Sequence, residues 1–215
     1  MFRSHRPGFH PWYLEAAEAR LLTHALEQAV DVALRFKKDL TLLAASDEDR
    51  YLVRVPRKDA GAPVWEDRVR TVSPPELKPI TVTLDVDVLE EVSRLPRNRH
   101  TLEMDFSVYP AQIGERGERP YFPYLLLVVE SRSGLILGSE FLAPEPDLAE
   151  MWGAIPARVL DRFADMGFVP RRIKVRSSLL YQLLQPLAEE LGFKVVSTPI
   201  LRNLDQVRES FLERF

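Results

Sequence analysis

The segment "TLEMDFSVYP" (residues 101–110) alternates apolar and polar side chains and carries an acid, Asp105, in its middle. Successive side chains of a strand point to opposite faces, so this pattern predicts a half-buried strand over residues 102–108. The two faces would carry Leu102, Met104, Phe106 and Val108 on one side and Glu103, Asp105 and Ser107 on the other. The sequence alone allows two roles for Asp105. It could be a metal-binding acid, or it could be a polar residue on the solvent side of the strand.

The residues that follow this strand predict a defined order of elements. Two more strands are expected, one over residues 124–130, apolar on both faces, and one over residues 135–142, joined by a short turn. A helix over residues 147–166 is expected to kink near Gly153, because Pro156 removes a backbone donor. Next come a strand over residues 172–176, a helix over residues 178–191, a strand over residues 194–197 and a final helix capped by Asn203.

The first part of the chain predicts a smaller unit. Apolar residues at helical spacing indicate a helix over residues 14–36, and two strands are expected over residues 51–55 and 64–69. We expect the apolar stripe of this helix, which includes Leu22, to pack on the two strands. The proline-rich segment "SPPELKP" (residues 73–79) can continue neither a helix nor a strand.

That segment predicts a boundary between a small N-terminal α+β domain (residues 1–78) and a second domain (residues 79–215). At the start of the second domain, the β-branched segment "ITVTLDV" (residues 80–86) predicts a strand. Asp87 and Glu90 then have the spacing of a capping box for a short helix.

Composition limits the functional classes. The chain has 29 basic and 32 acidic residues, a net charge of -3, and no cysteine. Duplex-binding proteins usually carry a concentrated basic surface, so the charge does not favour nucleic acid as a partner. The absence of cysteine excludes disulfides and thiolate chemistry. No apolar run is long enough to cross a bilayer, and the first residues have no apolar signal segment, so a cytoplasmic location is expected.

The element order of residues 100–215, three strands followed by helix, strand, helix, strand and helix, resembles that of the ribonuclease H-like superfamily. The resemblance implies a mixed sheet with helices (βββαβαβα). Four segments, "FRSHRPGFHPWYL", "HALEQAV", "RPYFPYLLLVV" and "SGLILG", also resemble a bacterial protein family of unknown function. This second resemblance implies a fold neighbourhood and no activity.

Ribonuclease H-like enzymes hold two divalent metal ions about 4 Å apart between carboxylates. Position by position, the resemblance places the first-strand acid at Asp105, the first-helix acid at Glu150 or else Asp161, and the last-helix acid at Asp205 or Glu209. At the end of the fourth strand, where the enzymes carry another acid, this chain has Arg176 and Ser177. A serine hydroxyl is a weaker ligand for Mg²⁺ than a carboxylate, and an arginine would repel the cation.

The leading hypothesis is therefore a non-catalytic interaction or regulatory protein with a degenerate ribonuclease H-like domain, without a metal or cofactor site. A protein partner or self-association would fit this role. One alternative is a nuclease dependent on Mg²⁺ with rearranged acids, in which Asp105, Glu150 and Asp205 would be catalytic. A second alternative is a small-molecule-binding module in a cleft between the two domains.

Overall fold

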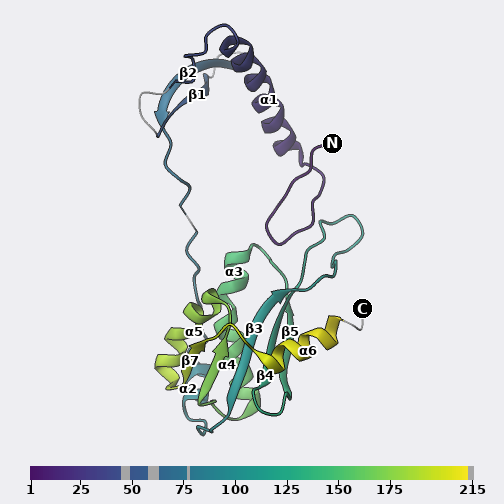
Figure 1. Ribbon diagram of the computed structural model, residues 1–215, viewed down its shortest axis with the longest axis vertical. Helices are drawn as coiled ribbons and strands as arrows, with labels where there is room; N and C mark the ends of the chain where they lie inside the picture. Colours follow the sequence, from purple (N-terminus) through teal and green to yellow (C-terminus); the bar gives the residue numbers. More distant parts are fainter. Residues whose placement is uncertain (45–48, 58–62, 77, 213–215) are drawn as a thin grey trace. The chain divides into compact units, whose positions relative to one another are not determined.

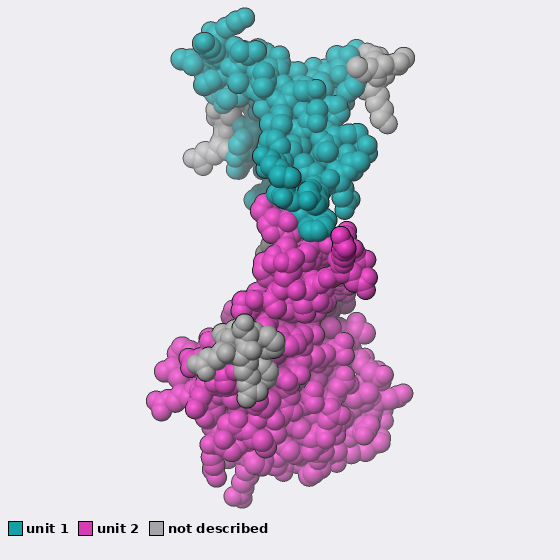
Figure 2. Space-filling view, turned by 90° about the vertical axis from the view of Figure 1, so that its right-hand side faces the viewer, with its two compact units in different colours: residues 1–4, 12–77 teal, residues 5–11, 78–215 magenta. Residues whose placement is uncertain are grey.

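The computed structural model describes residues 1–44, 49–57, 63–76 and 78–212, with side chains up to residue 210. The chain divides into two compact units (Figure 2). Unit 1 comprises residues 1–4 and 12–77, and unit 2 comprises residues 5–11 and 78–215.

Unit 1 consists of a long helix and a β-hairpin. Helix α1 (Ala16–Phe36) begins with a capping box between Glu15 and Glu18. Strands β1 (Arg50–Arg57) and β2 (Val64–Thr71) pair antiparallel, with Arg50 opposite Thr71 and Arg57 opposite Val64. These elements agree with the sequence prediction to within a few residues at their ends.

The contacts between α1 and the hairpin are polar. Arg35 and Arg54 both donate hydrogen bonds to Asp67 on β2. These hydrogen bonds lower the pKa of Asp67 to about 2, and the one from Arg35 has the larger effect. Arg54 also donates to Gln28 on α1 at 3.0 Å. No described side chain of α1 is buried. The expectation that the apolar stripe of this helix packs on the strands is therefore wrong, because the helix turns a polar side toward the hairpin.

Unit 2 is built on a five-stranded mixed sheet with the order β5-β4-β3-β6-β7 (Figure 1). Strands β3 (Thr101–Val108), β4 (Tyr124–Glu130) and β5 (Ile136–Leu142) form an antiparallel meander. Strands β6 (Arg172–Val175) and β7 (Lys194–Ser197) are parallel to β3 and are joined by helix α5 (Ser178–Leu191). This is the ribonuclease H-like arrangement that the element order predicted.

Helices cover both faces of this sheet. One face is covered by α2 (Val86–Ser93), α3 (Leu148–Gly153), α4 (Ile155–Met166) and α5. The larger hydrophobic core lies on this face and includes Leu102 and Met104 of β3. Helix α6 (Arg202–Leu212) contacts β3 and β4 on the opposite face. There Leu201 and Leu204 pack on Leu125, Leu127 and Val129 of β4. Asp105 lies on the face that α6 covers, and it is only 7% exposed.

Some local predictions were wrong. Residues 79–85 form no strand, and the short helix α2 is capped by Asp85, whose carboxylate accepts hydrogen bonds from the Asp87 and Val88 amides. Asn203 lies inside α6 instead of capping it, because a side chain from β3 takes the capping role. The long helix predicted over residues 147–166 is interrupted at Ala154, between α3 and α4, close to the expected kink.

In the described part of the chain, every helix is too short or too polar to cross a membrane.

Candidate functional site

Two acids of β3 lie beside two bases at the end of β6. In the parallel register Glu103 is opposite Lys174, and the next pair is Met104 with Val175. One step further along, the register brings Asp105 beside Arg176. All four charged side chains point to the face covered by α6, since strand side chains alternate. The two acids are therefore buried under a helix, each beside a partly exposed base.

Asp105, Arg176 and Asp205 form one connected cluster. The Nη2 atom of Arg176 donates to both carboxylate oxygens of Asp205, at 2.6 and 2.8 Å. Its Nη1 atom lies 3.7 Å from the carboxylate of Asp105. Arg208, one turn further along α6, lies 3.3 Å from the same Asp205 carboxylate. Two carboxylates and two guanidinium groups thus balance in charge.

The surroundings of this cluster shift the pKa values of its members. Burial raises the pKa of Asp105, and the positive charge of Arg176 offsets part of that rise. The hydrogen bond to Asp205 raises the pKa of Arg176, which is protonated at any physiological pH. The centre of the cluster is therefore a permanent cation. Ser177, beside it, caps α5 by accepting from the Leu180 amide at 3.3 Å.

Glu103 lies in a second cluster on the same face and attaches α6 to the sheet. One carboxylate oxygen accepts from the backbone amides of Asn203 and Leu204, both at 3.1 Å. The other accepts from the Ser131 hydroxyl at 2.9 Å and lies 3.6 Å from the Lys174 ammonium group. An acid at a helix N-terminus satisfies free amides and complements the helix dipole. These contacts give Glu103 a structural role.

Glu150, the third acid suggested by the resemblance, lies elsewhere. It is in the first turn of α3, its side chain is 53% exposed, and its carboxylate lies 3.9 Å from the Lys78 ammonium group. Helix α3 packs Met151 on the core of the other sheet face, so the sheet separates Glu150 from Asp105. Among the described residues, no group of three or more His, Asp or Glu side chains is placed to hold a metal ion.

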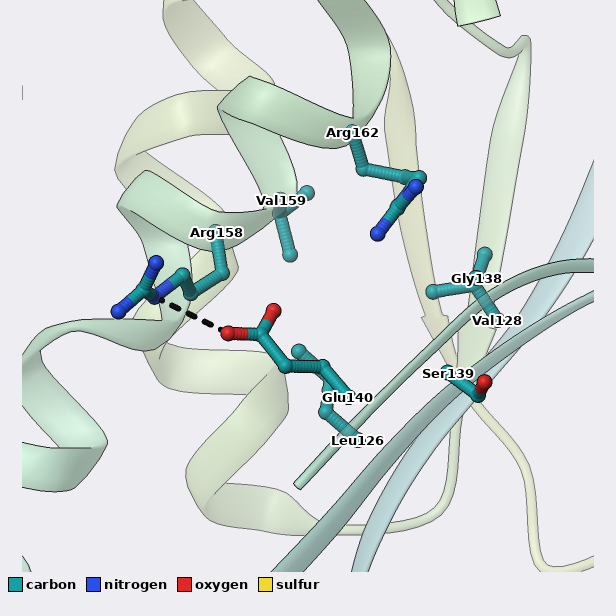
Figure 3. A pocket seen from close by; sticks show the side chains of 8 residues that line it. All are labelled: Leu126, Val128, Gly138, Ser139, Glu140, Arg158, Val159 and Arg162. Atoms are coloured by element: carbon teal, nitrogen blue, oxygen red, sulfur yellow. Dashed lines mark ion pairs between the residues drawn. The ribbon is translucent and has the colours of Figure 1, made fainter. Parts of the chain in front are cut away.

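Two hollows border helix α4 in unit 2. The first lies where Arg162 crosses Gly138 and where Arg158 pairs with Glu140 at 3.4 Å (Figure 3). Its volume is about 10 Å³, which is close to the space of a single water. The second, of about 260 Å³, lies between residues 81–83 and the helices α3 and α4. It is open and lined by both acids and bases, so neither hollow resembles an enclosed apolar ligand site.

The structure brings together Asp105, Asp205 and Arg176 from the sequence-based hypothesis, and beside them Glu103, Lys174 and Arg208, to which that hypothesis gave no role. Part of this arrangement could have been predicted from the sequence. Two acids at alternate positions of one strand and two bases at alternate positions of another match when the strands are parallel and in register. What the sequence did not show is the helix that covers them.

The strand order, the crossover and the two helical layers define a ribonuclease H-like α+β domain. The chain belongs to the family described as Domain of unknown function (DUF6930), which matches residues 88–212. Residues 1–54 match a second family, Domain of unknown function (DUF7309).

One similar solved structure is the catalytic core domain of BIV integrase. It is 15% identical to this chain, with a TM-score of 0.35, and the match covers 54% of this chain. The match spans 66% of the integrase chain, which is just under two thirds of its length. No curated protein matches the chain.

Proposed function

We propose that unit 2 is a non-catalytic ribonuclease H-like domain and that the protein acts as an interaction or regulatory module in the cytoplasm. One observation supports this proposal above the others, the guanidinium group of Arg176 between the carboxylates of Asp105 and Asp205. In a two-metal enzyme the acids at corresponding places hold divalent cations that activate water. A guanidinium group supplies the positive charge without an open coordination position.

The electrostatics argue against a metal ion at this position. Arg176 and Arg208 already balance the two carboxylates, so an incoming divalent cation would meet two fixed positive charges nearby. Glu150, which would complete a metal site, lies on the other side of the sheet. The cytoplasmic part of the proposal is supported by a sequence without cysteine.

Thermal melting with and without millimolar Mn²⁺ or Mg²⁺, combined with an assay of RNA–DNA heteroduplex cleavage, tests the proposal. We expect the melting temperature of the parent to be unchanged by the metals and no cleavage to occur. The informative variant is Asp105→Asn, and its control is Glu189→Gln, an exposed acid on helix α5 outside the cluster. Metal-dependent cleavage that is lost in Asp105→Asn and kept in Glu189→Gln would overturn the proposal and favour the nuclease alternative.

A further inference from the structure

Helix α1 in unit 1 directs its polar side to the hairpin. His24, Gln28 and Arg35 follow one side of the helix at intervals of four and seven residues. The ring of His24 lies 5.8 Å from that of Trp65, Gln28 accepts a hydrogen bond from Arg54, and Arg35 pairs with Asp67. The hairpin therefore occupies the side of α1 that offers polar contacts.

The apolar side of α1 points away from the hairpin. We call it the outer stripe, and it consists of Ala19, Leu22, Thr23, Leu26, Ala29, Val30 and Ala33. With about 100° per residue, Leu26 and Val30 lie on the far side of the helix from Gln28. They are 45% and 60% exposed. The Thr23 hydroxyl donates to the Ala19 carbonyl of its own helix at 2.8 Å, so it adds no unpaired donor to this surface.

Unit 1 also lacks a core of its own among the residues that the structure describes. Within that part of unit 1, Ser4 is the only buried residue. Small units without a sufficient core are usually stabilised by disulfides, metals or association. This chain has no cysteine to form a disulfide. An exposed apolar stripe on the longest helix is the surface through which association would supply the missing burial.

We infer that the outer stripe pairs antiparallel with the outer stripe of a second copy of the chain, about a two-fold axis at Leu26. The stripe is symmetric about this residue. Leu26 meets its own copy, and the other facing pairs are Ala19 with Ala33, Leu22 with Val30, and Thr23 with Ala29. A self-complementary patch of this kind is what a two-fold interface requires. The alanines allow the two helix axes to come close together, near the lower end of the usual 8–10 Å.

The charges at the two ends of the stripe select the antiparallel direction. Glu15 precedes the stripe and Lys37 follows it, and both are exposed. Each lies 11 positions from Leu26, so the same axis places Glu15 of one copy beside Lys37 of the other. A parallel pair would place like charges together at both ends. Exposed ion pairs contribute little affinity, and their effect here is on direction and register.

The size of the protein in solution gives the first test, which is independent of whether unit 2 is catalytic. We expect light scattering to give twice the 24.7 kDa of the chain. Leu26→Glu should give the single mass, because it places two charges together at the axis. Leu21→Glu is the matched control. It makes the same change on the same helix at a residue that is 72% exposed and about 140° around the helix from Leu26.

Two results of this test would overturn the inference. The first is a parent protein that stays monomeric at every accessible concentration. The outer stripe would then be covered by unit 2 or by a different protein. The second is a dimer that survives Leu26→Glu. Circular dichroism of each variant should show unchanged helix content, which separates loss of pairing from loss of folding.

Cross-linking tests the direction, since any introduced cysteine is the only one in the chain. A short bismaleimide should link two copies of Leu26→Cys. It should not link Glu15→Cys, whose two copies would lie about 33 Å apart in an antiparallel pair. Efficient linkage at both positions would indicate a parallel pair and overturn the proposed register. The charge reversal Lys37→Glu places like charges together at both ends of an antiparallel pair and should weaken the dimer.

Discussion

The carboxylate of Glu103 and the backbone amide of Leu204, 101 positions apart in the sequence, meet in a hydrogen bond of 3.1 Å. This contact fixes the first turn of α6 on the sheet. Because α6 then covers the polar side of β3, Asp105 is buried and comes within reach of Arg176 and Asp205. The position of one helix thus converts the polar side of an ordinary amphipathic strand into a partly buried charge cluster.

Glu103→Ala should destabilise unit 2 by about 2 to 4 kcal/mol, because it leaves two helix amides without their acceptor and the Lys174 ammonium group without its ion-pair partner. Glu103→Gln keeps one carbonyl oxygen and should cost less. Urea denaturation followed by circular dichroism measures both values. Equal stability of Glu103→Ala and the parent would show that the carboxylate does not hold α6 in place.

Arg176→Ala should cost about 3 kcal/mol, because it removes the cation closest to the buried Asp105 and leaves only Arg208 to offset its charge. Asp105→Asn in the same background removes the uncompensated charge and should recover part of this loss. Urea denaturation of the two single variants and the double variant gives the coupling energy. A double variant no more stable than Arg176→Ala would mean that Asp105 does not depend on the guanidinium group.

The lowered pKa of Glu130 predicts that the fold loses stability in acid. Burial alone would raise its pKa, but hydrogen bonds from the Ser133 amide and hydroxyl and the Arg132 amide outweigh this effect, and the pKa falls to about 2. A lowered pKa stabilises the fold above the unfolded value of about 4.3, and this contribution disappears as the pH falls through the folded value.

We therefore expect Glu130 to contribute about 1 to 2 kcal/mol at neutral pH, lost between about pH 5 and pH 2. Denaturation curves at a series of pH values measure the loss, and Glu130→Gln should show a flatter dependence over this interval. An identical pH dependence in the parent and the variant would assign the acid step to other carboxylates.

The sequence predicted most of this fold because periodicity reports the faces of an element directly. The alternation in residues 102–108 and the apolar run in residues 124–130 correspond to β3 and β4. The same alternation gave a wrong prediction of a strand for "ITVTLDV". Residues 79–85 pack Ile80 and Leu84 on the core beside the helices, and the Thr81 carbonyl lies where a Cβ atom on Gly153 would be. A segment pressed on helices can show the same alternation as a strand.

The state of Asp105 could not be predicted in the same way. Alternation placed its side chain on the polar side of β3, and from this we expected exposure to solvent if no metal was bound. That expectation is wrong, because the covering helix is nearly 100 residues away in the sequence and is held by Glu103. Local patterns report which face a residue occupies. They carry no information about what a distant segment places over that face.

A variant of Arg176 can test whether this residue occupies the place of a metal ion. Arg176→Asp would put a third carboxylate beside Asp105 and Asp205 in exchange for the guanidinium group. Without a cation the variant should be less stable than the parent, because buried like charges repel. Carboxylate oxygens are the ligands that Mg²⁺ and Mn²⁺ prefer, so millimolar Mn²⁺ should raise its melting temperature.

Binding to the folded state alone stabilises by about 1.4 kcal/mol at ten times the dissociation constant, which is large enough to detect in a thermal melt. Arg176→Ala is the matched control, since it removes the same guanidinium group without adding a ligand, and its melting temperature should not respond to Mn²⁺. If Mn²⁺ failed to stabilise Arg176→Asp, the carboxylates around Arg176 would lack the geometry of a metal site. The arginine would then be an ordinary structural partner of the two acids. Equal stabilisation of both variants would point to a metal bound elsewhere in the chain.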